Sequence, residues 1–124
     1  MSYFDGFVIP VPTENKDKFK EYADEIDAIF MEYGATRIVE CWPDDVPDGE
    51  HTDFRKAVKA KPDESAMFSF IEWPNKATRD VAMGKLHHMM QTDPRFDEKT
   101  NPPPFDGLRM IYGGFAPLVD LKKT

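Results

Sequence analysis

Hydrophobic residues along the chain follow two spacings, that of a β-strand and that of an α-helix. Short stretches rich in aromatic and β-branched residues predict four strands, bounded by turn-forming Pro, Gly, Asn and Asp. These strands are expected over residues 3–11, 35–42, 65–73 and 108–116. The spacing of apolar residues between them predicts helices instead.

Two longer helices are predicted. The first begins after Thr13 as its N-cap and ends at Gly34, which supplies the left-handed stop. Its apolar stripe consists of Phe19, Tyr22, Ala23, Ile26, Ile29, Phe30 and Tyr33. The second begins at Pro74-Asn75 and stops before Asp93-Pro94, because a residue before proline is disfavoured in the helical region. Its expected buried stripe consists of Ala82, Leu86, Met89 and Met90. A weaker pattern favours a short helix between 51 and 63, capped by Thr52.

The order of elements is strand, helix, strand, short element, strand, helix, strand. Because strand–helix–strand crossovers are right-handed, two such units place both helices on one face of a sheet. The predicted fold is therefore α+β, ferredoxin-like βαββαβ with a four-stranded antiparallel sheet. The whole chain, 1–124, is expected to form one domain, since its length is that of a single core.

The predicted strands are apolar on both faces. Phe4 and Val8 alternate with Phe7 and Ile9 in the first strand, and the third strand has the same pattern. Helices cover only one face, so the other would leave an apolar patch larger than soluble monomers tolerate. We therefore expect a homodimer in which two sheets pack face to face and partly close into a barrel.

Composition and charge exclude several function classes. Hydrophobic residues make up 40% of the chain, enough for a core without metal or disulfide staples, and Cys41 has no second cysteine to pair with. The net charge of −7 disfavours nucleic acid, and the one basic cluster, Arg55, Lys56, Lys59 and Lys61, is more typical of a solvated face. No membrane span or secretory signal is expected, which favours a cytoplasmic location.

The residue types most often used in metal and covalent chemistry are poorly placed for it. His87 and His88 are adjacent on a helix, so their side chains diverge by about 100° and cannot share a metal ion. His51 lies near the acidic loop 43–50, which is more typical of solvated turn chemistry than of a metal site. Cys41 lies within a strand, where packing is its expected role. No metal and no cofactor are predicted.

A group of polar residues on or beside the predicted strands is a better candidate. The topology is expected to bring these residues together, either as structural ion pairs around Arg109 or as the lining of a cleft between sheet and helices, beside Trp42. The candidate pocket residues are Asp5, Glu40, Trp42, His87, Asp106, Arg109 and Tyr112.

Several segments carry a resemblance to a known family. They are Asp5–Pro12, Glu40-Cys41 with Asp44–Pro47, Arg55–Val58, Phe68–Ile71, Asp93–Arg95 and Pro104–Phe115. Over nearly its whole length the chain resembles the YbaA-like family, a group of unknown function (DUF1428) within the dimeric α/β-barrel superfamily. The resemblance implies a ferredoxin-like subunit and a dimer, and it implies no established activity.

Three functional hypotheses remain open. The first is a dimeric protein that binds a small organic ligand in the cleft, without turnover. The second is an enzyme similar to the cofactor-independent oxygenases and isomerases of that superfamily, with Glu40 or His87 abstracting a proton. The third is a purely structural role. The sequence assigns no role to the acidic loop 43–50 or to the proline-rich segment 101–105.

Overall fold

The computed structural model describes residues 1–123 and contains a four-stranded sheet with two long helices. The elements in chain order are β1 (Tyr3–Pro12), the 3-10 turn η1 (Thr13–Asn15), α1 (Lys16–Glu32), β2 (Arg37–Cys41), the short α2 (Phe54–Ala57), β3 (Glu64–Trp73), α3 (Lys76–Thr92), the 3-10 turn η2 (Pro94–Phe96) and β4 (Ile111–Phe115).

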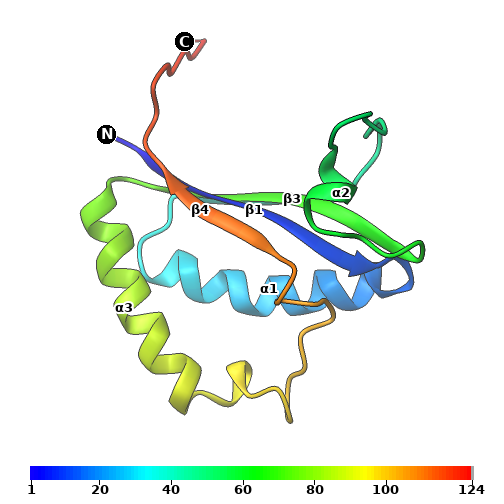
Figure 1. Ribbon diagram of the computed structural model, residues 1–124. Helices are drawn as coiled ribbons and strands as arrows, with labels where there is room; N and C mark the ends of the chain where they lie inside the picture. Colours follow the sequence, from blue (N-terminus) through cyan, green and yellow to red (C-terminus); the bar gives the residue numbers. More distant parts are fainter. Residues whose placement is uncertain (124) are drawn as a thin grey trace.

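The sheet has the ferredoxin-like arrangement that the sequence predicts. Its strand order is β2-β3-β1-β4, and all neighbouring strands are antiparallel. Helices α1 and α3 both lie on one side of it (Figure 1). Strands β2 and β4 are edges, so the sheet of a single chain is open, and the barrel implied by the family resemblance is not formed within this chain.

Strand register divides the side chains into a helix-facing set and an outward-facing set. Phe7 and Ile9 of β1 lie opposite Ser69 and Met67 of β3 and face the helices, as does Trp73. Together with apolar residues of α1 and α3, this inner set forms the core. The buried members are Ile9, Val11, Phe19, Ala23, Ile26, Ile29, Ala35, Met67, Ile71, Trp73, Ala82 and Leu86.

The outer set forms a nearly continuous aromatic surface. Phe4, Phe70 and Phe68 follow one another across β1 and β3, with ring centroids 6.2 Å and 6.5 Å apart. Phe54 of α2 meets Phe68 edge-on at 6.4 Å. Phe68 and Phe115 are 45% and 61% exposed, so no element of this chain covers the outer face fully.

The second helix buries a narrower stripe than predicted. Ala82 and Leu86 are buried and Met89 is half-buried, whereas Met90 is 60% exposed. The prediction for Met90 was wrong because Leu86 and Met89 already form the row that meets α1, and the next residue is rotated by about 100° toward solvent.

Several boundaries differ from the predicted ones for identifiable reasons. Asp53, not Thr52, caps α2 by accepting a hydrogen bond from the Lys56 amide. Thr13 does not cap α1; it begins η1, and its hydroxyl pairs with that of Ser65. The second strand covers only Arg37–Cys41 of the predicted 35–42. The fourth begins at Ile111 instead of 108, because residues 106–109 form a turn around the Arg109 side chain.

We expect the turn after α1 to tolerate only glycine. Gly34 has φ +114°, and a Cβ placed there would lie 2.7 Å from Cγ2 of Thr78. Gly34→Ala should lower the free energy of unfolding by about 1–3 kcal/mol. Gly84→Ala, in the interior of α3 with no atom within 4 Å of the new Cβ, should instead raise it by about 0.5–1 kcal/mol. Urea denaturation of both variants measures the difference, and equal effects would contradict this account.

Candidate functional site

A cleft of about 700 Å³ lies between α1 and the edge strand β2. Phe19 and Ala23 of α1, Ile38 of β2 and Met67 of β3 supply apolar walls. Trp42, directly after β2, stands at one end, where the Lys16 ammonium lies 5.5 Å from its ring centroid. β2 is an edge strand and has a neighbouring strand on one side only. Its helix-facing side is covered by α1, and the cleft lies between the two at this edge of the sheet.

Two carboxyl groups face each other across this cleft. Glu40 points inward from β2 beside Ser69 of β3, and Asp27 points inward from α1. Burial, followed by the neighbouring Glu40 carboxyl, raises the pKa of Asp27 to about 8. Burial also raises the pKa of Glu40, against opposing interactions with Asp27 and Ser69. The Asp27 carboxyl of this pair therefore holds a proton near neutral pH.

One oxygen of this pair receives no hydrogen bond from an amide, hydroxyl or cationic group. Across residues 1–123, Oε2 of Glu40 is the one fully buried side-chain polar atom that makes no hydrogen bond. Leaving a buried acceptor unsatisfied costs about 1–3 kcal/mol. Because this oxygen is fully buried, a molecule in the cleft would meet the carboxyl pair through its other atoms, and the proton held by Asp27 is the nearest donor for Glu40.

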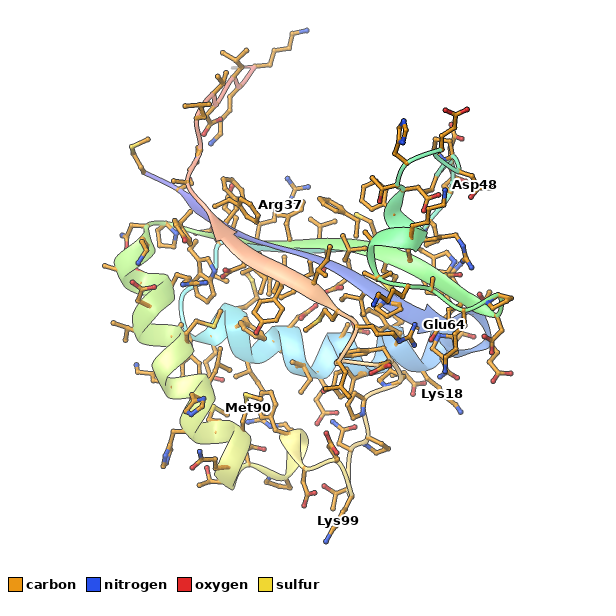
Figure 2. All side chains as sticks on the ribbon, in the orientation of Figure 1. Lys18, Arg37, Asp48, Glu64, Met90 and Lys99 are labelled. Atoms are coloured by element: carbon orange, nitrogen blue, oxygen red, sulfur yellow. The ribbon has the colours of Figure 1, made fainter. Side chains whose placement is uncertain are left out.

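The cationic side chains at the cleft rim are already engaged elsewhere. Lys20 Nζ pairs with Asp24 at 2.8 Å, and the guanidinium of Arg37 lies 5.9 Å from the centroid of Phe70 on the outer face. Figure 2 shows Arg37 on the side of the sheet opposite the helices. The cleft thus presents apolar walls and a carboxyl pair, and none of the residues described by the structure directs a free cation at that pair.

The structure separates the residues that the sequence predicts as one pocket. Glu40 and Trp42 line the cleft, but Asp5 lies elsewhere on the inner face. The Asp5 carboxylate is 3% exposed, accepts a hydrogen bond from Trp73 Nε1 at 2.9 Å and pairs with Arg79 Nη2 at 2.8 Å. Arg79 also lies 5.4 Å from the ring centroid of Tyr3. This cluster joins β1, β3 and α3 and leaves no group of Asp5 free.

Arg109 and Asp106 belong to a third, separate cluster. The Arg109 guanidinium binds both carboxylate oxygens of Glu64 at 2.7 Å, and its Nε donates to Asp106 at 2.8 Å. These contacts lower the pKa of Glu64 to about 2. The cluster fixes the start of β3 to the turn before β4, and of the two roles considered for Arg109 the structural ion pair is the one these contacts support.

The remaining predicted residues lie outside the cleft. His87 is exposed on α3, and Tyr112 of β4 is 72% exposed although it stacks on Phe7. Among residues 1–123, no group of three or more His, Cys, Asp or Glu is placed to hold a metal ion. None of the helices described is long and apolar enough to cross a membrane.

Asp27, Arg79 and Glu64 are the residues that sequence reasoning missed. Asp27 follows Ile26 on the helix stripe and looks like an ordinary solvated position, and Arg79 lies in the polar first half of α3. Glu64 follows a charged run and shows no sign of burial in the sequence. Only the spatial pairing with Glu40, Asp5 and Arg109 distinguishes them.

Comparison with known proteins gives a family and a fold. A family model described as "Protein of unknown function (DUF1428)" matches residues 2–107. Proteins named "Uncharacterized protein YbaA" from Escherichia coli K12 and Shigella flexneri are 52% identical over 120 residues, covering 97% of this chain and 99% of theirs.

Two solved structures share the fold at low identity. One is a dimeric ferredoxin-like protein from an uncultured marine organism, with TM-score 0.60, 8% identity and 98% and 100% of the two chains covered. The other is Rv0793 from Mycobacterium tuberculosis, with TM-score 0.52, 10% identity and the same coverage.

The carboxyl pair should make stability fall with rising pH. The folded-state pKa of Asp27 is about 8 against an ordinary value of 3.8, so the associated stability is complete below about pH 4 and is lost as pH rises through 8. The side chain of the Asp27→Asn variant cannot ionise. At pH 8.5 the free energy of unfolding of this variant should therefore exceed that of the wild type by at least about 1 kcal/mol, whereas at pH 4 it should not.

Urea denaturation at the two pH values measures this effect. Glu21→Gln is the control on the same helix, because Glu21 is exposed and does not line the cleft. A gain in Asp27→Asn that is equal at both pH values would contradict the proposed burial of the carboxyl pair.

Proposed function

The chain belongs to the DUF1428 family of proteins of unknown function, and we propose that it binds a small organic molecule in the cleft between α1 and β2. The observation that carries this proposal is the pair of carboxyl groups, Glu40 and Asp27, that lines an otherwise apolar cleft. A ligand with an apolar body and a hydroxyl or N–H group would donate a hydrogen bond to that pair while covering the surrounding walls.

The dimensions and lining of the cleft fit this class of ligand. A volume of about 700 Å³ lies within the range of small-molecule sites, and most such sites are apolar with a few convergent polar groups. Because the Asp27 carboxyl holds a proton near neutral pH, the pair offers both an acceptor and a donor. A neutral ligand with a hydroxyl group is therefore favoured over an anionic one, since the rim cations Lys20, Lys16 and Arg37 already contact Asp24, Trp42 and Phe70.

A proton-transfer enzyme is the second candidate, on the same observation. Glu40 is a carboxylate in an apolar cleft with a raised pKa, which is what a general base needs to work near neutral pH. His87, the other base considered, is exposed on α3 and does not line the cleft, so the enzymatic reading rests on Glu40 with Asp27 beside it.

We further propose that the protein is a homodimer through the outer face of the sheet. The aromatic surface around Phe68 and Phe115 is exposed in the single chain, and burying it is worth roughly 25 cal/mol per Å² before association costs. The dimeric ferredoxin-like protein from the marine organism supports this assembly at the level of the fold. Partial closure of two facing sheets into a barrel is part of the same proposal.

Ligand binding is tested with a matched pair of probes. 2-Phenylethanol and its methyl ether differ in one hydroxyl donor, so the alcohol should bind more tightly by roughly a factor of five to ten, the worth of one net hydrogen bond. Amide chemical shifts should change along α1 and β2. Ala28→Phe, which fills the cleft wall, should abolish these changes, whereas Ala77→Phe at an exposed position of α3 should not.

Two outcomes would contradict the ligand proposal. In the first, neither probe shifts the resonances of the cleft residues at millimolar concentration. In the second, Ala28→Phe and Ala77→Phe bind both probes as well as the wild type does. Equal affinity for the alcohol and the ether would leave an apolar cleft but remove the role given to Glu40.

The homodimer is tested by placing a charge on the outer face. Phe68→Asp should convert the protein to monomers at micromolar concentration, because two buried charges would face each other's apolar surface. Val81→Asp, at a 60% exposed position on α3, should remain dimeric. Sedimentation velocity gives the mass of each variant and circular dichroism checks that both are folded. A wild type that is monomeric at every concentration contradicts the proposal.

A further inference from the structure

The segment after β4, residues 116–123, carries apolar side chains that nothing in the described chain covers. Leu118, Val119 and Leu121 are 97%, 74% and 89% exposed. Figure 2 shows their segment extending free of the other elements. Three large aliphatic residues in one short exposed segment are unusual, since large exposed apolar groups tend to cluster at interaction sites. We call residues 116–123 the arm.

An apolar groove on the outer face is similarly uncovered. It encloses about 270 Å³ and is lined by Val8, Phe54, Phe68, Ile111 and Phe115, with Gly6 at its base. Ile111 is 46% exposed and Phe54 is 45% exposed. The groove is therefore open and apolar, with room for one or two aliphatic side chains.

The arm cannot be seated in its own groove as the chain is arranged. It leaves β4 at Phe115 and rises from the sheet on the side opposite the helices (Figure 1). The loop that carries α2 rises on the same side, at the other end of the sheet (Figure 1). The outer face thus lies between two projections, the arm at one end and the α2 loop at the other.

Two-fold symmetry brings these projections together between copies. Suppose that two outer faces meet in opposite orientations, so that the β4 end of one sheet lies over the α2 end of the other. The arm of each copy then lies over the α2 end of its partner, and the two equivalent contacts form together. The eight residues of the arm span at most about 28 Å when extended, which is most of the length of a ten-residue strand.

Charge complementarity favours the same pairing. The arm ends in Lys122 and Lys123, whereas the α2 loop carries the exposed Asp44, Asp45 and Asp48. Figure 2 shows Asp48 on this loop, on the outer side of the sheet. The basic end of the arm is thus directed to the acidic loop of the other copy, which precedes the basic residues Arg55 and Lys56 of α2.

From these observations we propose that the arm is an exchanged element, which docks its leucine side chains in the groove beside Phe54 and Phe68 of a second copy of this chain. The proposal rests on the homodimer proposed above and adds to it the segment that locks the two copies together. It also gives the acidic loop 43–50 a role, as the surface that receives the basic end of the arm.

The first test compares aspartate substitutions at matched leucines. The double variant Leu118→Asp, Leu121→Asp should raise the dimer dissociation constant by roughly a factor of ten or more, because each dimer loses two docked arms. Leu108→Asp is the control, since Leu108 is also 97% exposed but lies before β4. Sedimentation equilibrium measures the three constants. An unchanged constant in the double variant overturns the arm while leaving the homodimer in place.

The second test locates the arm directly. A nitroxide label is attached at Lys123→Cys in a Cys41→Ser background, and this protein is mixed with isotope-labelled wild-type chains. Intermolecular broadening of the amide signals of Phe54 and Phe68 supports the proposal. Broadening confined to the labelled chain's own residues, with a dimer still present, overturns it. If no dimer forms at any concentration, the homodimer and the arm both fail.

Discussion

The buried carboxylate of Asp5 makes the interaction on which the position of α3 against the sheet depends. The Asp5 carboxylate accepts a hydrogen bond from Trp73 and forms an ion pair with Arg79. A single side chain of β1 therefore links β3 to α3. The helix α3 buries only Ala82 and Leu86, too little apolar area to fix its position alone. Removing one partner of a buried ion pair typically costs 3–5 kcal/mol, so the apolar and charged contacts of α3 are interdependent.

A second ion cluster links separate elements at the far end of the sheet. Arg109 joins Glu64 and Asp106, which ties the start of β3 to the turn that leads into β4. The proline-rich segment before this turn places Phe105 between Phe19 and Tyr22 of α1, at ring distances of 5.8 Å and 5.9 Å. Ion pairs therefore stabilise both ends of the sheet. The cleft lies in the open region between α1 and β2.

The fold was predictable from the sequence, and of the cleft residues the sequence identified Glu40 and Trp42 but not Asp27. The aromatic and β-branched runs of the strands and the three-and-four spacing of Phe19, Ala23 and Ile26 are short-range features that can be recognised in the sequence alone. The candidate pocket joined residues from β1, β2 and the turn before β4 because they lie on one sheet, and the structure distributes them among three clusters. Asp27 shows why: a carboxylate on a helix looks solvated until the register of β2 brings Glu40 opposite it.

The register of β2 links the two proposed surfaces of the molecule. Glu40 faces the cleft beside Ser69, while its neighbours Val39 and Cys41 lie beside Phe70 and Phe68 on the outer face. A slip of one residue would move the carboxylate of Glu40 onto the aromatic surface and turn Val39 and Cys41 toward Asp27. That exchange would remove the polar end of the cleft and place a charge in the face proposed to join two copies. As a short edge strand, β2 pairs through its backbone with one neighbour only, and this pairing alone would fix its register weakly. The different chemistry of its two faces specifies the register strongly, because a slip would place each set of side chains on the wrong surface.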